Sequence, residues 1–189
     1  PGHNLFLKKR FKSIFNISSG LILDVGCGPL LNTPIPQGRV YGIDINLDYI
    51  KKYSMENRTG LVSSADLIPF KNDIFNESRC FGLLHHLPKE AALLTLREMI
   101  RCTKVNGRVI ILDNVWPRNP YSRPLAWLSR RLDRGQWVRH ERELLNITKL
   151  LTIISISAPP PRTLYCIVVF LDARLLFASL SILIAATLV

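Results

Sequence analysis

The chain has 189 residues, 48% of them hydrophobic, and its 25 lysines and arginines against 14 acidic residues give a net charge of +11. This length predicts one domain with a substantial core, and the hydrophobic content excludes an intrinsically disordered protein. The positive charge favours anionic partners, namely nucleic acid, phosphorylated small molecules or an anionic membrane, without choosing among them.

The four cysteines follow no metal-binding or redox pattern. None are spaced as CxxC, and no histidine stands at zinc-finger spacing from a cysteine pair. We therefore expect reduced thiols in a cytoplasmic protein, and no metal site. Residues 1–12 are basic and mixed, and they do not resemble a secretory signal.

Helix and strand signals alternate along the first part of the chain. Residues 5–15 predict an amphipathic helix. Short apolar runs typical of buried strands lie at Leu21–Val25, Arg39–Ile45, Leu61–Ala65 and Arg108–Leu112, and helical patterns lie at Asp48–Asn57 and Ala91–Lys104. This alternation favours right-handed βαβ units on a mostly parallel sheet.

The pattern changes after Asp113. Residues 116–124 predict a loop, and helices are expected at Leu125–Leu132 and Glu141–Leu150. Two β-rich runs follow, Thr152–Ser157 and Thr163–Leu171, and we expect them to complete the sheet as a hairpin.

A glycine turn follows the first predicted strand directly, in the run Leu23-Asp24-Val25-Gly26-Cys27-Gly28. Glycines at this place let the backbone approach a ligand where a Cβ would clash. Asp44 ends the next strand, about 20 residues later, where an acid can accept hydrogen bonds from ribose hydroxyls. Asp66 follows the third strand, so three acids are expected to line one edge of the sheet. A dinucleotide dehydrogenase is disfavoured because Leu31 replaces the third glycine of its fingerprint.

Five motifs in this order, LDVGCGP, GIDIN, SADLIPF, GLLHHLP and NGRVIILD, resemble those of class I S-adenosylmethionine-dependent methyltransferases. The resemblance covers Leu21–Asp113, and its nearest subgroup contains ubiquinone-biosynthesis-type and small-molecule enzymes. It implies an α/β, Rossmann-like fold with a mostly parallel seven-stranded sheet, helices on both faces and an antiparallel last strand. It also implies S-adenosylmethionine as the cofactor and methyl transfer to a small molecule, such as a lipid, glycan or quinone-like acceptor.

The resemblance also implies roles for single residues. Ribose hydroxyls would bind Asp44, and the sulfonium and the substrate would lie near Leu84 and His85. The full cofactor-binding set consists of Asp24, Gly26, Cys27 and Gly28 around the methionine part, Asp44 and Ile45, Asp66 and Leu67 beside the adenine, and Leu84. His85 and His86 are candidates for a general base, since a neutral imidazole can accept a proton near pH 7. The alternative is that one packs against the sheet and the other caps the following helix.

Three segments depart from the family pattern. Residues 75–81 include Glu77 and Arg79, which are awkward in a strand covered on both faces, so we expect only Cys80–Leu84 to form that strand. The crossover at residues 29–38 is short and contains two prolines, and Asn106-Gly107 replaces the usual turn. These departures leave a second hypothesis open, a catalytically silent protein that binds S-adenosylmethionine.

Arginines and aromatic residues crowd the region after Asp113, and an uncharged tail ends the chain. The basic segment predicts a groove for an anionic acceptor, and the alternatives are an ordinary solvated helical face, stacking on nucleic acid as in an RNA methyltransferase, or a membrane surface. The segment comprises Arg118, Arg123, Arg130, Arg131, Arg134, Arg139 and Arg142, interleaved with Trp116, Tyr121, Trp127 and Trp137. We expect a methyltransferase domain at residues 1–172 and an apolar tail at residues 173–189 that contacts the domain, a second subunit or a membrane.

Overall fold

A mostly parallel β-sheet organises the chain in the computed structural model, which describes residues 20–29, 39–54, 58–117, 119, 121, 124–147, 165–171 and 182–183. The strands are β1 (Leu21–Val25), β2 (Arg39–Asp44), β3 (Thr59–Val62), β4 (Phe75–Phe81), β5 (Thr103–Asn114), β6 (Tyr165–Leu171) and β7 (Ile182–Leu183). Their order in the sheet is β3-β2-β1-β4-β5-β6-β7, and every pair from β3·β2 to β5·β6 is parallel. The fold is therefore the expected α/β, Rossmann-like one.

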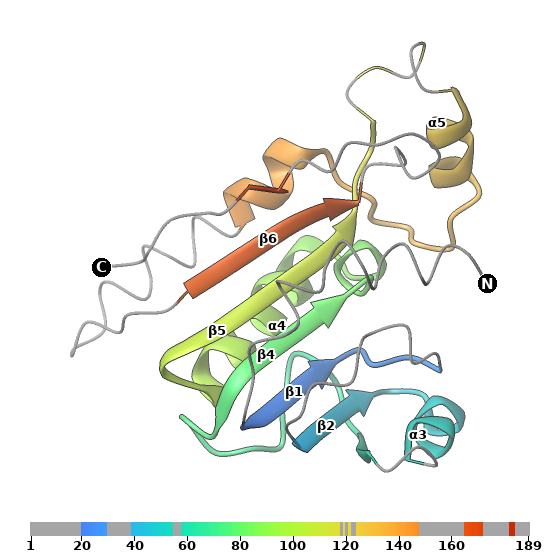
Figure 1. Cartoon of the computed structure of the whole chain (residues 1–189). Coiled ribbons are helices and arrows are strands. Elements are labelled where there is room, and N and C mark those ends of the chain that lie inside the picture. The colour runs from blue at the N-terminus through green and yellow to red at the C-terminus, as the bar shows by residue number, and fades with distance from the viewer. Residues whose placement is uncertain are drawn as a thin grey trace.

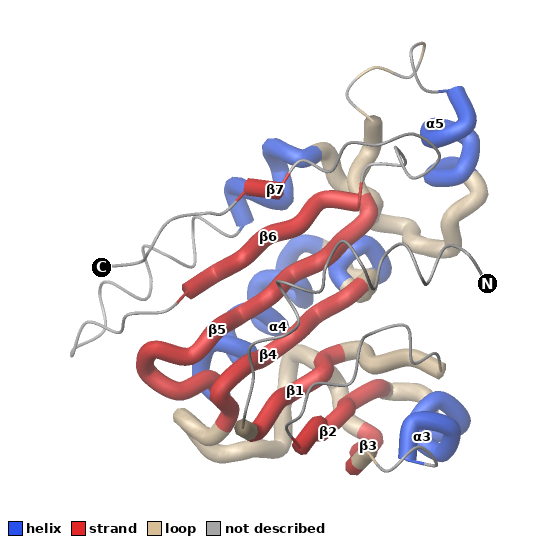
Figure 2. The backbone as a smooth tube through the Cα atoms, in the orientation of Figure 1, coloured by secondary structure: helices blue, strands red, loops and turns tan. Residues whose placement is uncertain are grey.

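Helices lie on both faces of this sheet (Figures 1 and 2). The described helices are α3 (Leu47–Ser54), the short 3₁₀ helix η1 (Leu84–His86), α4 (Lys89–Cys102) and α5 (Pro124–Arg131), and residues 141–147 are also helical. Leu96 and Met99 of α4 pack into the main core together with Leu23, whereas Tyr53 of α3 packs with Ile22 in a second cluster. Since successive strand residues point to opposite faces, the apolar run of β1 is explained by burial on both sides.

The expectation that only Cys80–Leu84 forms the fourth strand is wrong, because β4 begins at Phe75 and ends at Phe81. Its charged side chains are buried but paired. Glu77 is 0% exposed and accepts hydrogen bonds from Arg79 and from Arg108 of the neighbouring strand β5. The negative charge of a buried carboxylate is compensated when it lies between two guanidinium groups. This pairing allows the polar sequence to form a central strand.

The expectation that Thr163–Leu171 forms the antiparallel last strand of the sheet is also wrong. Residues 165–171 form β6, which runs parallel to β5 along its whole length. Antiparallel pairing occurs further on, where Ile182 and Leu183 of β7 meet Val169 and Val168 of β6. Ile182 and Leu183 fall within the predicted apolar tail, so a part of that segment pairs with the sheet.

Several predicted elements agree with the structure within a few residues. The helix expected at Ala91–Lys104 is α4, the one expected at Leu125–Leu132 is α5, and the third strand begins two residues earlier than expected. The predicted helix at residues 5–15, the crossover at residues 30–38 and the strand at residues 152–157 lie outside the described residues. Among the helices that are described, none combines the length and the apolar character needed to cross a membrane.

Candidate functional site

A pocket of about 110 Å³ lies where β2 and β3 end. It brings together four residues that the sequence predicted for cofactor binding, Gly26, Asp44, Ile45 and Asp66. Its other lining residues are Ile43, Ser63, Ser64, Ala65, Leu83, Leu87, Ala91 and Thr95. The carboxyl ends of parallel strands are the usual place for a ligand in an open α/β sheet.

The glycine turn after β1 has a backbone that other residues rarely adopt. Gly26 and Gly28 have φ angles of +67° and +62°, a left-handed region that glycine enters without steric cost. A Cβ on Gly26 would lie 2.8 Å from a methyl group of Leu83, so the turn packs closely against the segment after β4. A Cβ on Gly28 would meet nothing within 4 Å, so the backbone there faces open space.

Asp44 connects the end of β2 to this turn. Its Oδ2 atom accepts a hydrogen bond from the Gly28 amide at 3.0 Å, and its Oδ1 atom accepts one from the Asn46 amide at 2.9 Å. An ionised carboxylate offers about four lone-pair positions. Asp44 thus fixes the shape of the turn and keeps capacity to accept further hydrogen bonds from a ligand.

Asp24 lies near the end of β1, two residues before Gly26, and is only 5% exposed. Burial raises the pKa of this carboxyl, and the nearby charges of Arg79 and Arg58 oppose that shift. Tyr53 donates a hydrogen bond to Asp24 Oδ2 at 3.3 Å. Gly42 makes room for the tyrosine, because a Cβ there would lie 2.5 Å from the ring.

The remaining predicted cofactor residues differ in their access to the pocket. Ile45 and Leu67 are 75% and 76% exposed, and Ser64 donates a hydrogen bond to Asp66. Cys27 is partly buried, and this burial raises the pKa of its thiol. Leu84 is fully buried in the main core, so its side chain has no surface to offer a ligand.

The two predicted catalytic histidines have different surroundings. His85 is 4% exposed, with Nδ1 at 2.5 Å from Asp113 Oδ1 and Nε2 at 3.5 Å from Asp133 Oδ1. The His86 side chain is exposed, and its ring centroid lies 4.1 Å from that of His85. Partial burial, followed by the charge of His85, lowers the pKa of His86, which favours its neutral form at pH 7.

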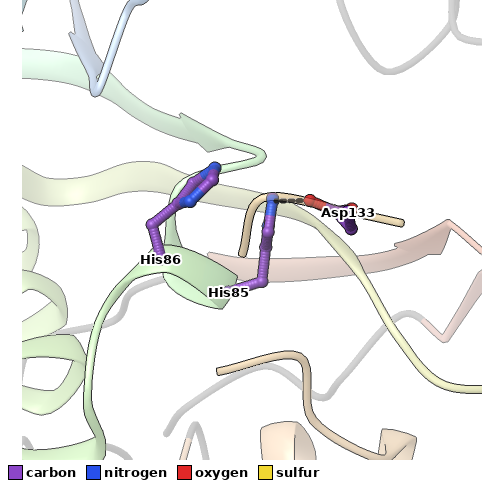
Figure 3. Close-up of side chains that lie close together, drawn as sticks. All are labelled: His85, His86 and Asp133. Carbon is purple, nitrogen blue, oxygen red and sulfur yellow. Dashed lines mark ion pairs between the residues drawn. The ribbon is translucent and has the colours of Figure 1, made fainter. Parts of the chain in front are cut away.

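A loop after α5 closes over η1 and positions these histidines (Figure 3). The Trp137 amide donates a hydrogen bond to the His85 carbonyl at 2.9 Å. Arg139 donates to the carbonyls of Leu84 and Leu87, each at 2.6 Å. Glycine is required at position 135, since a Cβ there would lie 2.1 Å from the His85 ring.

Sequence reasoning missed both carboxylate partners of His85. Asp113 stands at the end of the NGRVIILD motif, where its position at a strand end was the available signal. Asp133 is 48 residues from His85 in the chain, and no local pattern connects the two. Only the folding of the loop onto η1 brings Asp133 to the histidine.

A second pocket of about 500 Å³ adjoins the start of α4. It is lined by Pro88, Lys89, Glu90, Gln136, Trp137, Val138, Arg139, Glu143, Asn146 and Ile147. This volume falls in the range of about 300–1,000 Å³ that small-molecule sites usually have.

Comparisons with known proteins agree with this geometry. Residues 23–111 match the family described as "Methyltransferase domain". An uncharacterised protein of Methanocaldococcus jannaschii is 35% identical over 119 residues, which are 61% of this chain and 43% of that protein. The chain therefore spans less than half the length of this curated relative.

Many solved structures are similar in fold, including the following two. One is an S-adenosylmethionine-dependent methyltransferase from Archaeoglobus fulgidus, with a TM-score of 0.59, 20% identity and coverage of 78% of this chain and 68% of that one. The other is geranyl diphosphate C-methyltransferase from Streptomyces coelicolor, in complex with Mg²⁺, geranyl diphosphate and S-adenosyl-L-homocysteine. Its TM-score is 0.55, with 17% identity and coverage of 77% and 60%.

These structural similarities show the fold, and residues 23–111 are similar in sequence to a methyltransferase domain. The glycine turn, Asp44 at the end of β2 and the pocket between them lie within or beside the matched segment. Residues 23–111 therefore resemble a methyltransferase domain, and the sheet that carries the pocket has the fold of the S-adenosylmethionine-dependent methyltransferase from Archaeoglobus fulgidus.

Proposed function

We propose that this chain transfers the methyl group of S-adenosylmethionine to a small-molecule acceptor. The observation that carries this proposal is the pocket uniting Gly26, Asp44 and Asp66 at the edge of the sheet, within the segment that is similar to a methyltransferase domain. The sulfonium cofactor supplies an activated methyl group when bound. The protein then has to align the acceptor with the methyl–sulfur bond, and such alignment alone can lower a barrier by about 7–11 kcal/mol.

The residues of the pocket suit this cofactor in shape and chemistry. Asp44 uses one acceptor position on each oxygen for backbone amides, which leaves positions for two ribose hydroxyls. The exposed side chain of Ile45 and the carboxylate of Asp66 would contact the adenine. The pocket volume of about 110 Å³ holds only part of the cofactor, and the methionine part would lie over Gly28, where the backbone is open.

The pocket beside α4 is our candidate for the acceptor. Its lining carries one exposed lysine, Lys89, and two exposed glutamates, Glu90 and Glu143, so the charge of this pocket does not by itself select an anionic acceptor. The guanidinium of Arg139 is directed to backbone carbonyls instead. The fold neighbour that holds geranyl diphosphate shows that this architecture can accommodate a small anionic substrate.

His85 and His86 would have separate roles in this proposal. Both nitrogens of His85 face carboxylates, and the ring is almost fully buried, so His85 is a positioning residue for η1. His86 is exposed and can contact an acceptor.

Calorimetric titration with S-adenosylhomocysteine tests the cofactor site. Replacing Asp44 by alanine removes charge-assisted hydrogen bonds that contribute about 1.5–3 kcal/mol each, so we expect affinity to fall at least tenfold. Asp48→Ala is the matched control, because the Asp48 side chain is 79% exposed and pairs with Lys51 on α3. A wild-type chain that binds neither S-adenosylmethionine nor its demethylated product would refute the proposal.

An acceptor screen separates the alternative functions. Methyl transfer to lipid, glycan or quinone-like compounds would support the proposal, and transfer to RNA would favour an RNA methyltransferase. Cofactor binding without transfer to any acceptor class would favour the silent binding protein. The main reason for that last hypothesis was the polar fourth strand, and the pairing of Glu77 with Arg79 and Arg108 accounts for it.

A further inference from the structure

Three potential metal ligands converge beside η1. In the part of the chain that the structure describes, His85, His86 and Asp133 form a group whose ligand atoms all lie within 4.8 Å of one another. Figure 3 shows both imidazole rings and the carboxylate on the same side of the η1 ribbon. The sequence predicted no metal site, since its cysteines and histidines follow no metal-binding spacing, and Asp133 comes from a distant loop that local patterns do not connect to the histidines.

The distances suit a small divalent ion. Zinc lies about 2.0–2.2 Å from nitrogen and oxygen ligands, so two ligand atoms in a tetrahedral site are about 3.4 Å apart. His85 Nε2 and Asp133 Oδ1 are 3.5 Å apart. A direct charged hydrogen bond is usually about 2.7–2.9 Å long, so this pair is more widely spaced than a good ion pair needs. The ligand atom of His86 lies within 4.8 Å of the other two, and this exposed ring is free to turn toward them.

The surrounding hydrogen bonds orient the ligands as in known metal sites. Asp113 accepts from His85 Nδ1 at 2.5 Å, and a neutral ring held in this way presents the Nε2 lone pair to an ion. Asp133 accepts hydrogen bonds from Asn114 Nδ2 at 2.9 Å and from the Gly135 amide at 3.0 Å. A carboxylate behind a ligating histidine, and donors behind a ligating carboxylate, are typical of protein metal sites.

We propose that His85, His86 and Asp133 bind a divalent transition-metal ion of the Zn²⁺ type, with Asp113 holding His85 in place. Two imidazoles and one carboxylate match Zn²⁺ and related ions, whereas Mg²⁺ and Ca²⁺ prefer oxygen ligands alone. Three protein ligands leave a fourth position open, as in catalytic zinc sites. That position accepts water or an oxygen atom of a second ligand.

The site is preformed by the loop that carries Asp133. The absence of a side chain at Gly135, the hydrogen bond from Trp137 and those from Arg139 hold this loop against η1. Little ordering remains when an ion binds, so the entropic cost of binding is small. Arg130 Nη1 lies 3.9 Å from Asp133 Oδ2, the oxygen that does not face His85.

Metal titration of the full chain tests this proposal without any cofactor or acceptor. After chelator treatment, Zn²⁺ is titrated by calorimetry, and Co²⁺ is titrated by its visible absorption, which reports coordination geometry. We expect one ion per chain. We expect His86→Ala and Asp133→Asn to weaken binding at least tenfold, and Asp113→Asn to weaken it by about 10–100-fold, as is usual for an outer partner.

His140→Ala is the matched control, because His140 is exposed and lies outside the cluster. Its metal affinity should equal that of the wild type. Far-UV circular dichroism of the metal-free His86→Ala protein checks that an exposed substitution leaves the fold intact. Binding of less than half an ion per chain, or binding unchanged in His86→Ala, would overturn the proposal. A failed methyl-transfer assay would leave it standing, because the titration contains no S-adenosylmethionine.

Discussion

Replacing Glu77 by glutamine tests the buried ion network in the centre of the sheet. Glu77 is 0% exposed and binds both Arg79, which is 1% exposed, and Arg108. Glutamine keeps the shape of the side chain but removes the negative charge that compensates Arg79. Breaking a buried pair in this way costs about 3–5 kcal/mol, and since glutamine can still accept a hydrogen bond we expect a loss of about 3 kcal/mol.

This loss is large for a domain whose total stability is about 5–15 kcal/mol. For a chain of this size, each kcal/mol lowers the melting temperature by about 2–4 °C, so the midpoint should fall by about 6–12 °C. Urea unfolding followed by circular dichroism measures the free energy, and a thermal scan measures the midpoint. Glu90→Gln, on the exposed first turn of α4, should change stability by less than about 1 kcal/mol.

If Glu77→Gln were as stable as Glu90→Gln, burial of Arg79 without a compensating negative charge would cost nothing, and ion pairing would not explain why the polar sequence of β4 forms a central strand. A change in the denaturant slope m together with the midpoint would indicate altered compactness instead of a simple loss of stability.

Three further predictions concern other residues. Gly42→Ala places a methyl group 2.5 Å from the Tyr53 ring, so it should destabilise the protein by about 1–3 kcal/mol in urea unfolding. Burial raises the pKa of Asp24 in the folded protein. The protonated carboxyl therefore favours folding below its unfolded-state pKa, and this contribution is lost as the pH rises through the folded-state pKa. Asp24→Asn should therefore raise the melting temperature at pH 7, with a smaller gain near pH 4, and equal effects at both would contradict this reasoning. Arg134→Glu with Arg142→Glu, both exposed, should impair use of an anionic acceptor in methyl-transfer assays while leaving S-adenosylhomocysteine affinity within twofold in calorimetry.

Local sequence predicted well where the glycine turn and the neighbouring strand end lie. The glycine turn and the acid at the end of β2 are signalled by residues within a short stretch of chain. The positions of Gly26, Gly28 and Asp44 at strand ends could therefore be predicted before the fold was known. Asp44 and Gly28 are 16 residues apart and do bond to each other. The pocket therefore follows from strand ends that meet at one edge of a parallel sheet.

Long-range pairings could not be predicted in the same way. The strand character of residues 75–81 depends on Arg108, which lies 31 residues from Glu77 on the neighbouring strand. The direction of β6 was misassigned because β-rich sequence predicts a strand without specifying its partner. Asp133 reaches His85 only because residue 135 has no side chain, and a glycine in an arginine-rich loop gives no such signal by itself.

The arginine-rich segment after Asp113 divides into two groups with different consequences for the acceptor. Arg139 donates to two carbonyls at the ends of η1, and Arg130 donates to the Val115 carbonyl at 3.3 Å, so these side chains stabilise the loop. Arg131 lies over the Trp127 ring at 5.3 Å. Arg134 and Arg142 are exposed and can attract an anion from solvent. Charge counted from the sequence therefore overstates the charge available to a ligand, since part of it holds the histidine-bearing turn in place. A basic segment of this kind can serve the site mainly as structure, and only its remaining exposed arginines would contribute to the proposed preference for an anionic acceptor.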